Sequence, residues 1–214
     1  MAHLVWDWNG TLLDDTALVV AATNATLAGL GAPAVSVDDH RRGFFRPVAD
    51  YYAVLLGHPV PPEDFALLDE TFHVVYREGL DGAGLAPDAL AAIAAWRGTQ
   101  SLLSMFFHVD LVALVRRHGL EPLLDRVDGL RAHVDGGSKA PHLAAHLAAL
   151  HVDPADAVLI ADTVDDADAA RALGARIVLY TGGVTDEDRL RATGAPLAGS
   201  LLEAVAVAAS LRAA

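Results

Sequence analysis

Acidic residues directly follow two of the apolar runs in this sequence. The run that begins at His3 leads into Asp7-Trp8-Asn9-Gly10-Thr11-Leu12, and a later run leads into Ala161-Asp162-Thr163-Val164-Asp165-Asp166. A carboxylate in such a place is suited to act as a nucleophile or to bind a hard cation such as Mg²⁺. Gly10 allows the sharp turn that brings backbone N–H groups near an anion. An isolated Asp before a helix is more often an N-cap, but the second acidic run makes that alternative weaker for Asp7.

The second acidic run has a spacing that suits a metal site. Asp162 and Asp166 are four residues apart at a predicted strand-to-helix junction, so one helical turn keeps both carboxylates on the same side. Mg²⁺ takes few protein ligands and keeps several waters, which matches two or three carboxylates. Asp165, Asp166 and Asp168 have an alternative role, because acidic residues stabilise the positive N-terminus of a helix.

The elements that must position these residues are read from hydrophobic periodicity. Short apolar runs predict buried parallel strands at 3–7, 101–105, 126–129, 157–162 and 176–180. Helical patterns at 109–118, 141–150 and 165–173 lie between the later runs. This alternation predicts an α/β fold, a doubly wound (Rossmann-like) parallel sheet. Ligands bind beyond the carboxyl ends of such strands, so both acidic runs are expected at one edge of the sheet.

The interval between the first two strands is too long for an ordinary connection. Roughly eighty residues separate them, whereas most βα connections are far shorter. Helical patterns at 17–30, 37–45, 48–56 and 62–76 fill the interval, with Gly31, Gly57 and the pair Pro61-Pro62 as helix boundaries. We therefore predict an inserted helical cap domain at residues 16–81, and a core domain at 1–15 and 82–214.

Composition limits the class of protein. The chain has 214 residues, 53% of them hydrophobic, with a formal net charge of -13. This charge repels nucleic acid and anionic membranes, so neither is expected as a partner. There is no cysteine, no apolar run long enough to span a membrane and no basic leader before the first strand. A cytoplasmic protein, monomeric or homodimeric, is the expectation.

Four motifs, in order along the chain, resemble those of the haloacid dehalogenase-like (HAD) hydrolases. The family's first motif, an apolar strand followed by D-x-D-G-T-L, is similar to residues 5–12, and its second, a Ser or Thr ending the next strand, to Ser104. Its third, a Lys that opens a helix, matches Lys139, and its fourth, G-D-x-x-x-D, matches Asp162 and Asp166 with Ala161 in place of Gly. The inserted helices resemble the family's C1 cap, and the phosphoglycolate phosphatase-like branch is the nearest in shape.

The resemblance implies a mechanism and a site. Asp7 would attack phosphorus and form an aspartyl-phosphate, which is nucleophilic catalysis. Mg²⁺ would be bound by Asp7, the backbone carbonyl of Asn9 and Asp162, while Asp166 orients its water ligands. Lys139 would offset negative charge, and Ser104, with Thr11 of the first motif, would bind the substrate's phosphoryl group. The substrate would be a small phosphorylated metabolite.

Asn9 departs from the family pattern, which has an Asp that protonates the leaving group and then activates water. An amide does neither, and such help is worth about 10²–10⁴-fold in rate. The favoured hypothesis is a phosphatase that is slow or selective for good leaving groups, in which Asn9→Asp raises turnover. The alternatives are a catalytically weakened protein that binds or senses a phosphate ligand, and C–halogen hydrolysis, which the retained acidic motif disfavours. His108 is a candidate substitute for the missing acid, although a solvent-facing histidine is the more common case.

Arginines in the inserted segment are candidates for substrate recognition. Arg42 and Arg46 resemble the specificity stretch of C1 caps, where a guanidinium clamps a second anionic group of the substrate. A solvated surface position is an equally good interpretation of either residue.

Overall fold

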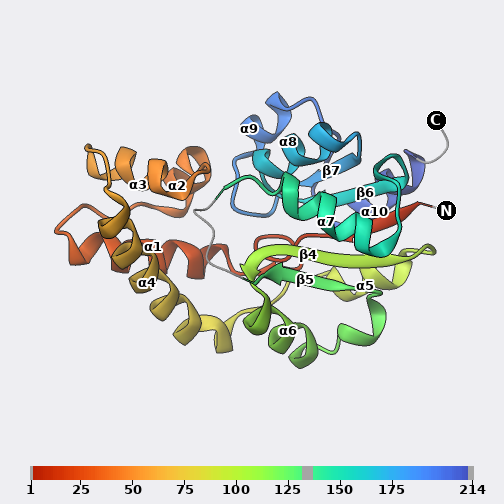
Figure 1. Ribbon diagram of the computed structural model, residues 1–214, viewed down its shortest axis with the longest axis horizontal. Coiled ribbons are helices and arrows are strands. Elements are labelled where there is room, and N and C mark those ends of the chain that lie inside the picture. The colour runs from red at the N-terminus through yellow and green to blue at the C-terminus, as the bar shows by residue number, and fades with distance from the viewer. Residues whose placement is uncertain (1, 132–136, 212–214) are drawn as a thin grey trace.

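The computed structural model describes residues 2–131 and 137–211, and the remaining residues of the predicted core domain lie outside the described part. Its centre is a sheet of parallel strands in the order β5-β4-β1-β6-β7-β8 (Figure 1). The strands are β1 (His3–Trp6), β4 (Gln100–Phe107), β5 (Val127–Leu130), β6 (Ala157–Ala161), β7 (Arg176–Tyr180) and β8 (Leu197–Ala198). The chain moves outward from β1 to one side and then to the other, so the strand order reverses at β1. Such a reversal is where doubly wound sheets bind ligands.

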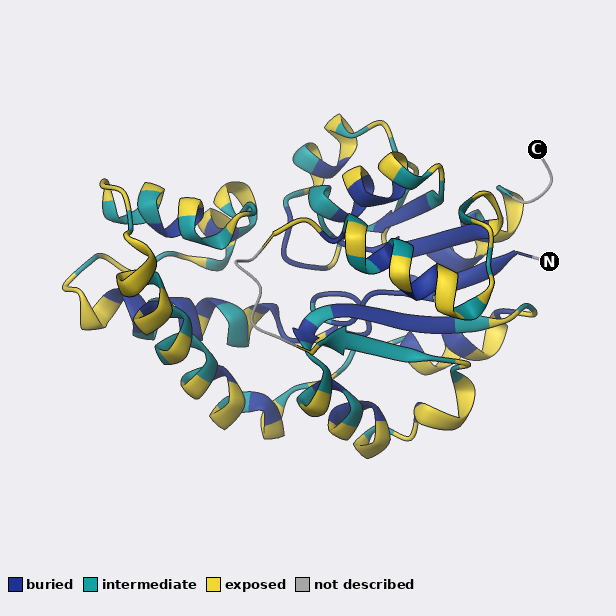
Figure 2. Ribbon diagram, in the orientation of Figure 1, coloured by how far each residue is buried: buried dark blue, intermediate teal, exposed yellow. Residues whose placement is uncertain are grey.

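Helices cover both faces of the sheet (Figure 1). One face packs against α5 (Ala89–Ala95), α6 (His108–Arg117) and α10 (Leu201–Ser210). The other packs against α7 (Ala140–Leu150), α8 (Val164–Leu173) and α9 (Glu187–Ala192). Leu4 and Trp6 belong to the first core and Val5 to the second, as the alternation of a strand requires. Figure 2 shows most of the central strands buried, β5 at the edge of the sheet with intermediate burial, and the outer helix surfaces exposed.

A short antiparallel ribbon connects the core to the inserted helices. Strand β2 (Leu13–Asp14) pairs with β3 (Gly84–Leu85), so the chain leaves and returns at one place. The helices between them are α1 (Thr16–Gly29), α2 (Val37–Gly43), α3 (Val48–Leu56) and α4 (Pro62–Gly79). They have a small apolar core of their own, centred on Leu27, Tyr52 and Leu68. The predicted fold class, a doubly wound parallel sheet with an inserted helical cap, is confirmed.

Helix boundaries follow local chemistry. The Ser36 side chain caps α2 by accepting from Asp39 N, and Gly57 ends α3 in the left-handed conformation. Single 3₁₀ turns complete the connections at Leu80–Gly82, Glu121–Leu123 and Pro154–Asp156. Helices α5, α9 and α10 and strand β8 were not predicted, because α5 and α10 are rich in Ala and have weak periodicity, and α9 and β8 are too short to show any.

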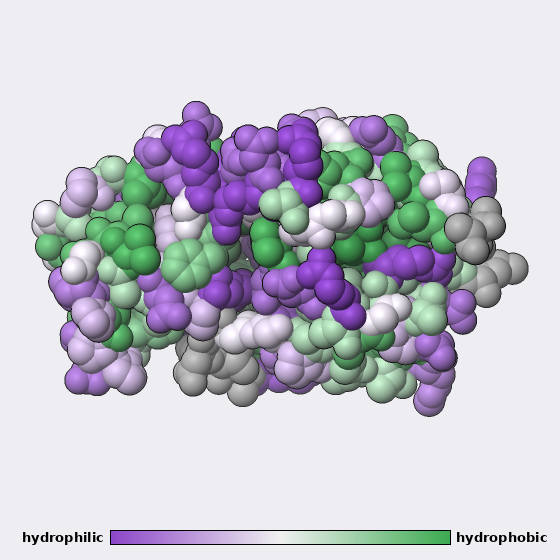
Figure 3. Space-filling model, turned by 90° about the horizontal axis from the view of Figure 1, so that it is seen from above, coloured by the Kyte–Doolittle hydropathy of each residue, from purple (hydrophilic) through white to green (hydrophobic). Residues whose placement is uncertain are grey.

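The exterior is mixed in polarity. On the face in Figure 3, hydrophilic side chains gather over the middle of the molecule, and hydrophobic ones lie over the outer parts of the cap and the core. No helix within the described residues has the length and hydrophobicity to cross a membrane.

A buried chain of polar side chains crosses the sheet beneath α7. His3 Nε2 and His146 Nε2 lie 2.7 and 2.8 Å from Ser101 Oγ, and His146 Nδ1 lies 2.8 Å from Asp128 Oδ2. Although Asp, His and Ser occur here in a hydrogen-bonded series, Ser101 is fully buried, so no substrate reaches it. Burial lowers the pKa of His3 to about 4, and repulsion from His146 acts in the same direction.

The buried His3 side chain makes the stability of the fold depend on pH. The unfolded chain binds protons at His3 below about pH 6.5, whereas the folded chain does so only near pH 4, so stability is lost as pH falls through this window. We expect His3→Gln to remove about 1 kcal/mol of the difference in unfolding free energy between pH 7 and pH 5. Urea denaturation at both pH values measures it, with the exposed His58→Gln as control. An unchanged pH dependence in His3→Gln would contradict this account.

Candidate active site

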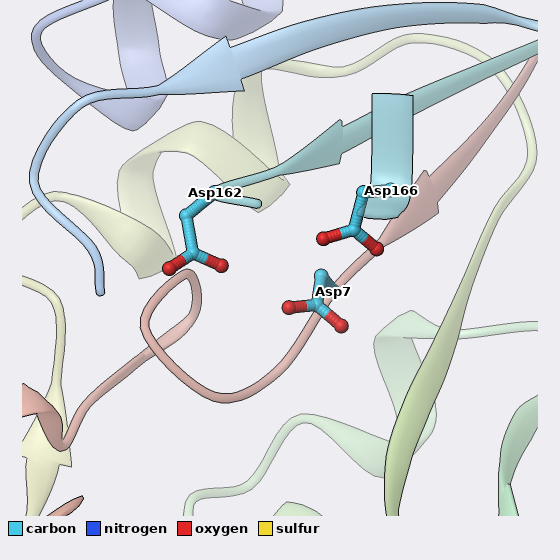
Figure 4. A group of neighbouring side chains, drawn as sticks. All are labelled: Asp7, Asp162 and Asp166. Carbon is cyan, nitrogen blue, oxygen red and sulfur yellow. The ribbon is translucent and has the colours of Figure 1, made fainter. Parts of the chain in front are cut away.

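Three carboxylates meet where β1 and β6 end (Figure 4). Asp7 follows β1 directly, Asp162 follows β6, and Asp166 lies in the first turn of α8. Each offers an oxygen within 4.8 Å of the others, and all three are buried. Because β1 and β6 are parallel neighbours, their carboxyl ends bring both acidic runs to the same edge of the sheet.

Local hydrogen bonds hold the two carboxylates of the second run. Thr163 caps α8, accepting from Asp166 N and donating to Asp166 Oδ2 at 2.5 Å. Asp162 Oδ1 accepts from Thr11 Oγ1 at 3.1 Å, and Asp162 Oδ2 accepts from Val184 N at 2.7 Å. Neither carboxylate can rotate freely, which preorganises the site.

Lys139 joins the group from the N-terminus of α7. Its ammonium lies 2.5 Å from Asp7 Oδ1 and 2.6 Å from Asp166 Oδ1, and its side chain is almost wholly buried. Burial acts to lower the pKa of Lys139, but Asp166 and Asp7 outweigh it and raise that pKa. The lysine is therefore charged, in contact with both carboxylates.

The electrostatics of this group fit a divalent cation. Burial raises the pKa of Asp7 to about 6 against the pull of Lys139, and burial together with Asp7 and Asp166 raises the pKa of Asp162. Three ionised carboxylates and one ammonium leave two negative charges in a buried space. One Mg²⁺ ion would balance that charge, and carboxylate oxygens are the ligands it prefers. The residues present therefore fit the metal that the sequence predicts.

Two glycines leave room for the Asp162 carboxylate. A Cβ atom on Gly10 would lie 2.3 Å from Asp162 Oδ2, and one on Gly183 would lie 2.0 Å from the same atom. Gly10 also has a φ of +70°, which other residues rarely adopt. The site thus depends on the absence of side chains at two positions far apart in sequence.

Gly183→Ala is expected to displace Asp162 and destabilise the protein by about 1–3 kcal/mol, as overpacking of a well-packed site does. It should also weaken the thermal stabilisation that added Mg²⁺ gives the parent protein. Differential scanning fluorimetry with and without Mg²⁺ measures both effects. Gly29→Ala, whose Cβ meets nothing within 4 Å, is the matched control. If Gly183→Ala responds to Mg²⁺ as the parent does, Asp162 does not need this space.

The Asn9 amide is fixed by three partners. Its Nδ2 donates to Asp15 Oδ2 at 2.8 Å and to the Tyr76 hydroxyl at 2.7 Å, and its Oδ1 accepts from Ser104 Oγ at 3.2 Å. Both amide hydrogens are used, so Asn9 has none to offer a leaving group. Ser104 ties β4 to the first motif through this contact.

Asp15 and Tyr76 complete the network, and sequence reasoning missed both. Asp15 is fully buried and accepts from Tyr76 Oη at 2.5 Å and from Gly10 N at 2.7 Å. Burial raises the pKa of Asp15, while the hydrogen bonds from Tyr76 and Asn9 act against that rise. The sequence did not single out Asp15, because no local pattern shows whether Asp14 or Asp15 faces inward.

A cavity of ≈ 200 Å³ opens onto the site from beneath the cap. Its lining includes Asp7, Asn9, Ser104, Lys139 and Asp166, together with Arg46 of the cap. Hydrogen bonds join the cap to the core near Phe44, which lines the cavity: Arg41 donates to the Gly182 carbonyl, and Arg189 donates to the carbonyls of Arg41 and Phe44. The end of α2 in the cap therefore contacts the segment of the core that follows β7.

Three residues singled out in the sequence lie elsewhere. Arg42 pairs with Asp39 on the surface, where its side chain is 60% exposed. Thr11 is fully buried against Asp162, so it supports that carboxylate from behind and does not line the cavity. His108 accepts a hydrogen bond from Gly129 N outside the cavity lining. The sequence did not show this, because the direction of each side chain depends on the rotation of its helix and the path of its loop.

Comparison with known proteins agrees with this geometry. A family model described as HAD-hydrolase-like matches residues 136–208. The chain is 29% identical over 194 residues to a phosphoglycolate phosphatase of Caulobacter vibrioides, covering 87% of this chain and 81% of that protein.

Solved structures share the whole fold. A haloacid dehalogenase-like family hydrolase from Streptococcus pneumoniae superposes with a TM-score of 0.82 at 18% identity, over 97% of this chain and 98% of that one. A predicted phosphatase from Clostridium acetobutylicum does so with a TM-score of 0.83 at 15% identity, over 98% of each chain. Residues 136–208 are therefore similar in sequence to the haloacid dehalogenase-like hydrolases, and the fold is similar to that of solved structures described by that name.

Proposed function

We propose that this protein is a Mg²⁺-dependent phosphatase that acts on a small phosphorylated metabolite through an aspartyl-phosphate at Asp7. The observation that carries the proposal is the position of Asp7, which lines the cavity, contacts Lys139 and shares a metal-sized space with Asp162 and Asp166. The similarity to the Caulobacter phosphoglycolate phosphatase supports it.

In the first step, an oxygen of Asp7 attacks phosphorus in line; the new O–P bond forms as the ester P–O bond breaks and the alcohol leaves. In the second, water attacks the same phosphorus, which frees Asp7 and inorganic phosphate. Lys139 offsets the negative charge on the transferred group throughout. Mg²⁺, when bound by Asp7, Asp162 and the Asn9 carbonyl with Asp166 behind its water ligands, supplies further positive charge.

Asn9 slows the first step for poor leaving groups and the second step for every substrate. The alcohol leaves without a proton from position 9, and the attacking water has no base there. We propose that Tyr76, Asp15 and Ser104 hold the amide so that its oxygen and nitrogen keep fixed directions. Good leaving groups then react much faster than alkyl phosphates, and the aspartyl-phosphate accumulates.

The inserted helices supply the rest of the enzyme. We propose that residues 16–81 act as a cap over a core of residues 1–15 and 82–214, with Arg46 on the cap side of the substrate. The protein would work in the cytoplasm as a monomer or homodimer, with no nucleic acid or membrane partner.

A second candidate function is the binding or sensing of a phosphate ligand without turnover. The hydrogen bonds of Asn9 favour this second function. Its amide group is fully used by Asp15, Tyr76 and Ser104, so it cannot transfer a proton to a leaving group or from a water molecule.

Hydrolysis of p-nitrophenyl phosphate distinguishes the two functions. A phosphatase releases nitrophenolate with Mg²⁺ and stops in EDTA, and its first turnover gives a burst equal to the enzyme concentration if the intermediate accumulates. A panel of phosphorylated metabolites, with released phosphate measured, then identifies the substrate. No release from any ester, with and without Mg²⁺, would leave the binding function as the better account.

A further inference from the structure

The cavity has two chemically different halves. The half next to Asp7 is polar and charged, as described above. The other half is formed largely by aromatic rings from the cap and from β4, of which Phe44, Tyr51, Phe65, Phe72, Phe106 and Phe107 form the main part. The phosphoryl group belongs to the first half, so the remainder of the substrate contacts the second.

These rings hold one another in place. Phe44 packs edge-on against Tyr51 with ring centroids 5.3 Å apart, and Phe72 stacks on Tyr76 at 5.7 Å. Tyr76 in turn packs edge-on against Phe106 at 5.5 Å. Rings in such mutual contacts do not collapse into the cavity, so the apolar wall is preformed.

The charges that line the cavity do not favour a second anionic group. Asp69 and Asp165 add carboxylates to those of the metal site. Lys139 is already paired with Asp7 and Asp166, and His73 lies 3.3 Å from Asp69. A carboxylate on the organic part of a substrate would therefore face like charges at short range.

Two basic side chains on the cap side do not reverse this. Burial lowers the pKa of His40 to about 4, so this ring is neutral near pH 7. Arg46 also lines the cavity, but the four lining carboxylates, Asp7, Asp69, Asp165 and Asp166, outnumber its guanidinium and the Lys139 ammonium.

The size of the cavity sets the size of the group. It measures ≈ 200 Å³, and a cavity of about 150 Å³ in another protein holds benzene. There is room for a phosphoryl group at Asp7 and for one ring or a short alkyl chain against the aromatic wall.

We propose that the substrate is a phosphate monoester whose organic part is uncharged and apolar, about the size of a phenyl ring, and not a phosphorylated carboxylic acid such as phosphoglycolate. This inference rests on the proposed function, because it assumes that the phosphoryl group lies at Asp7. Specificity then comes from burial of apolar surface against Phe44, Phe65 and Phe72.

Non-hydrolysable ligands test the pocket apart from catalysis. Calorimetric titration with Mg²⁺ compares 3-phenylpropylphosphonate, propylphosphonate and 2-carboxyethylphosphonate. We expect the phenyl ligand to bind at least about tenfold more tightly than the other two, as burial of a ring implies. Equal or tighter binding of the carboxylate ligand would overturn the proposal.

Substitutions of Phe72 and Phe45 test which side chains give the preference for the phenyl ligand. Phe72→Ala should reduce the ratio of affinities for the phenyl and propyl ligands to within about threefold of one, whereas Phe72→Leu, which keeps an apolar side chain, should retain most of it. Phe45→Ala removes a cap aromatic that does not line the cavity and should keep the parent ratio. Equal ratios in Phe72→Ala and the parent would overturn the assignment of the wall.

The corresponding phosphate esters separate this inference from the proposed function. The three esters have alkyl leaving groups of similar type, so their kcat/KM values compare recognition more than chemistry. If neither these esters nor p-nitrophenyl phosphate is hydrolysed but the phosphonates show the preference, the pocket assignment stands and the phosphatase function fails. If all three are hydrolysed at equal kcat/KM, the function stands and the substrate class is overturned.

Discussion

The double variant Asn9→Asp/Asp15→Asn is expected to hydrolyse alkyl phosphates about 10²-fold faster than the parent, whereas Asn9→Asp alone should gain little. The reason is the 2.8 Å contact between Asn9 Nδ2 and Asp15 Oδ2. A carboxylate at position 9 would lie against the carboxylate of Asp15, and two such groups share one proton between them. That proton is not available to a leaving group.

The double variant exchanges amide and carboxyl without changing the charge. The new amide at position 15 can donate to the new carboxyl at position 9, and the Tyr76 hydroxyl remains between them. This contact revises the expectation from sequence that Asn9→Asp by itself raises turnover. The carboxyl at position 9 is expected to act only when its neighbour is neutral.

Steady-state kcat/KM values on nitrophenyl and alkyl phosphates measure the effect. The double variant should show a flatter dependence of rate on leaving-group pKa, and Asp15→Asn alone, which adds no acid, should not be faster than the parent. If Asn9→Asp alone accelerates alkyl esters as much as the double variant, Asp15 is no obstacle and the account of this contact is wrong.

Asp7→Asn is expected to lower kcat by at least about 10⁴-fold, because an amide oxygen does not displace an alcohol from phosphorus. The shape of the side chain is retained, and Lys139 keeps its ion pair with Asp166 at 2.6 Å, so the protein should remain folded. Circular dichroism checks the fold, and the rate on p-nitrophenyl phosphate checks the chemistry.

Asp165→Asn is the matched control. Asp165 lines the same cavity and accepts from Lys139 N at 3.2 Å, but it is not one of the three clustered carboxylates. Its variant should stay within about tenfold of the parent rate, because it leaves the nucleophile in place. Retention of one hundredth or more of the parent activity by Asp7→Asn would show that another group attacks phosphorus.

Most of the fold was predictable because buried parallel strands have a plain signal. Four continuous apolar runs begin at His3, Ser101, Ala157 and Arg176. The corresponding strands are buried on both faces. The cap helices were predictable from glycine and proline boundaries, such as Gly57 after α3. Strand β8, two residues long, is too short for any periodicity to register.

What the sequence by itself determined is the position of the carboxylates at the strand ends. Asp7 and Asp162 come directly after parallel strands, so their proximity follows from topology once the strands are recognised, and Asp166 follows from the helical repeat. Residue type and spacing carry this information because the backbone geometry of strands and helices is nearly invariant.

Only the tertiary structure decided which other side chains face the site. The contact between Asn9 and Tyr76 joins residues 67 positions apart, and it depends on how α4 of the cap docks on the core. The same docking places Arg46 in the cavity lining and leaves Arg42 exposed, although the two arginines are equally plausible in the sequence. Docking angle and helix phase arise from many small packing contacts across the whole interface, and no local pattern of residues encodes their sum.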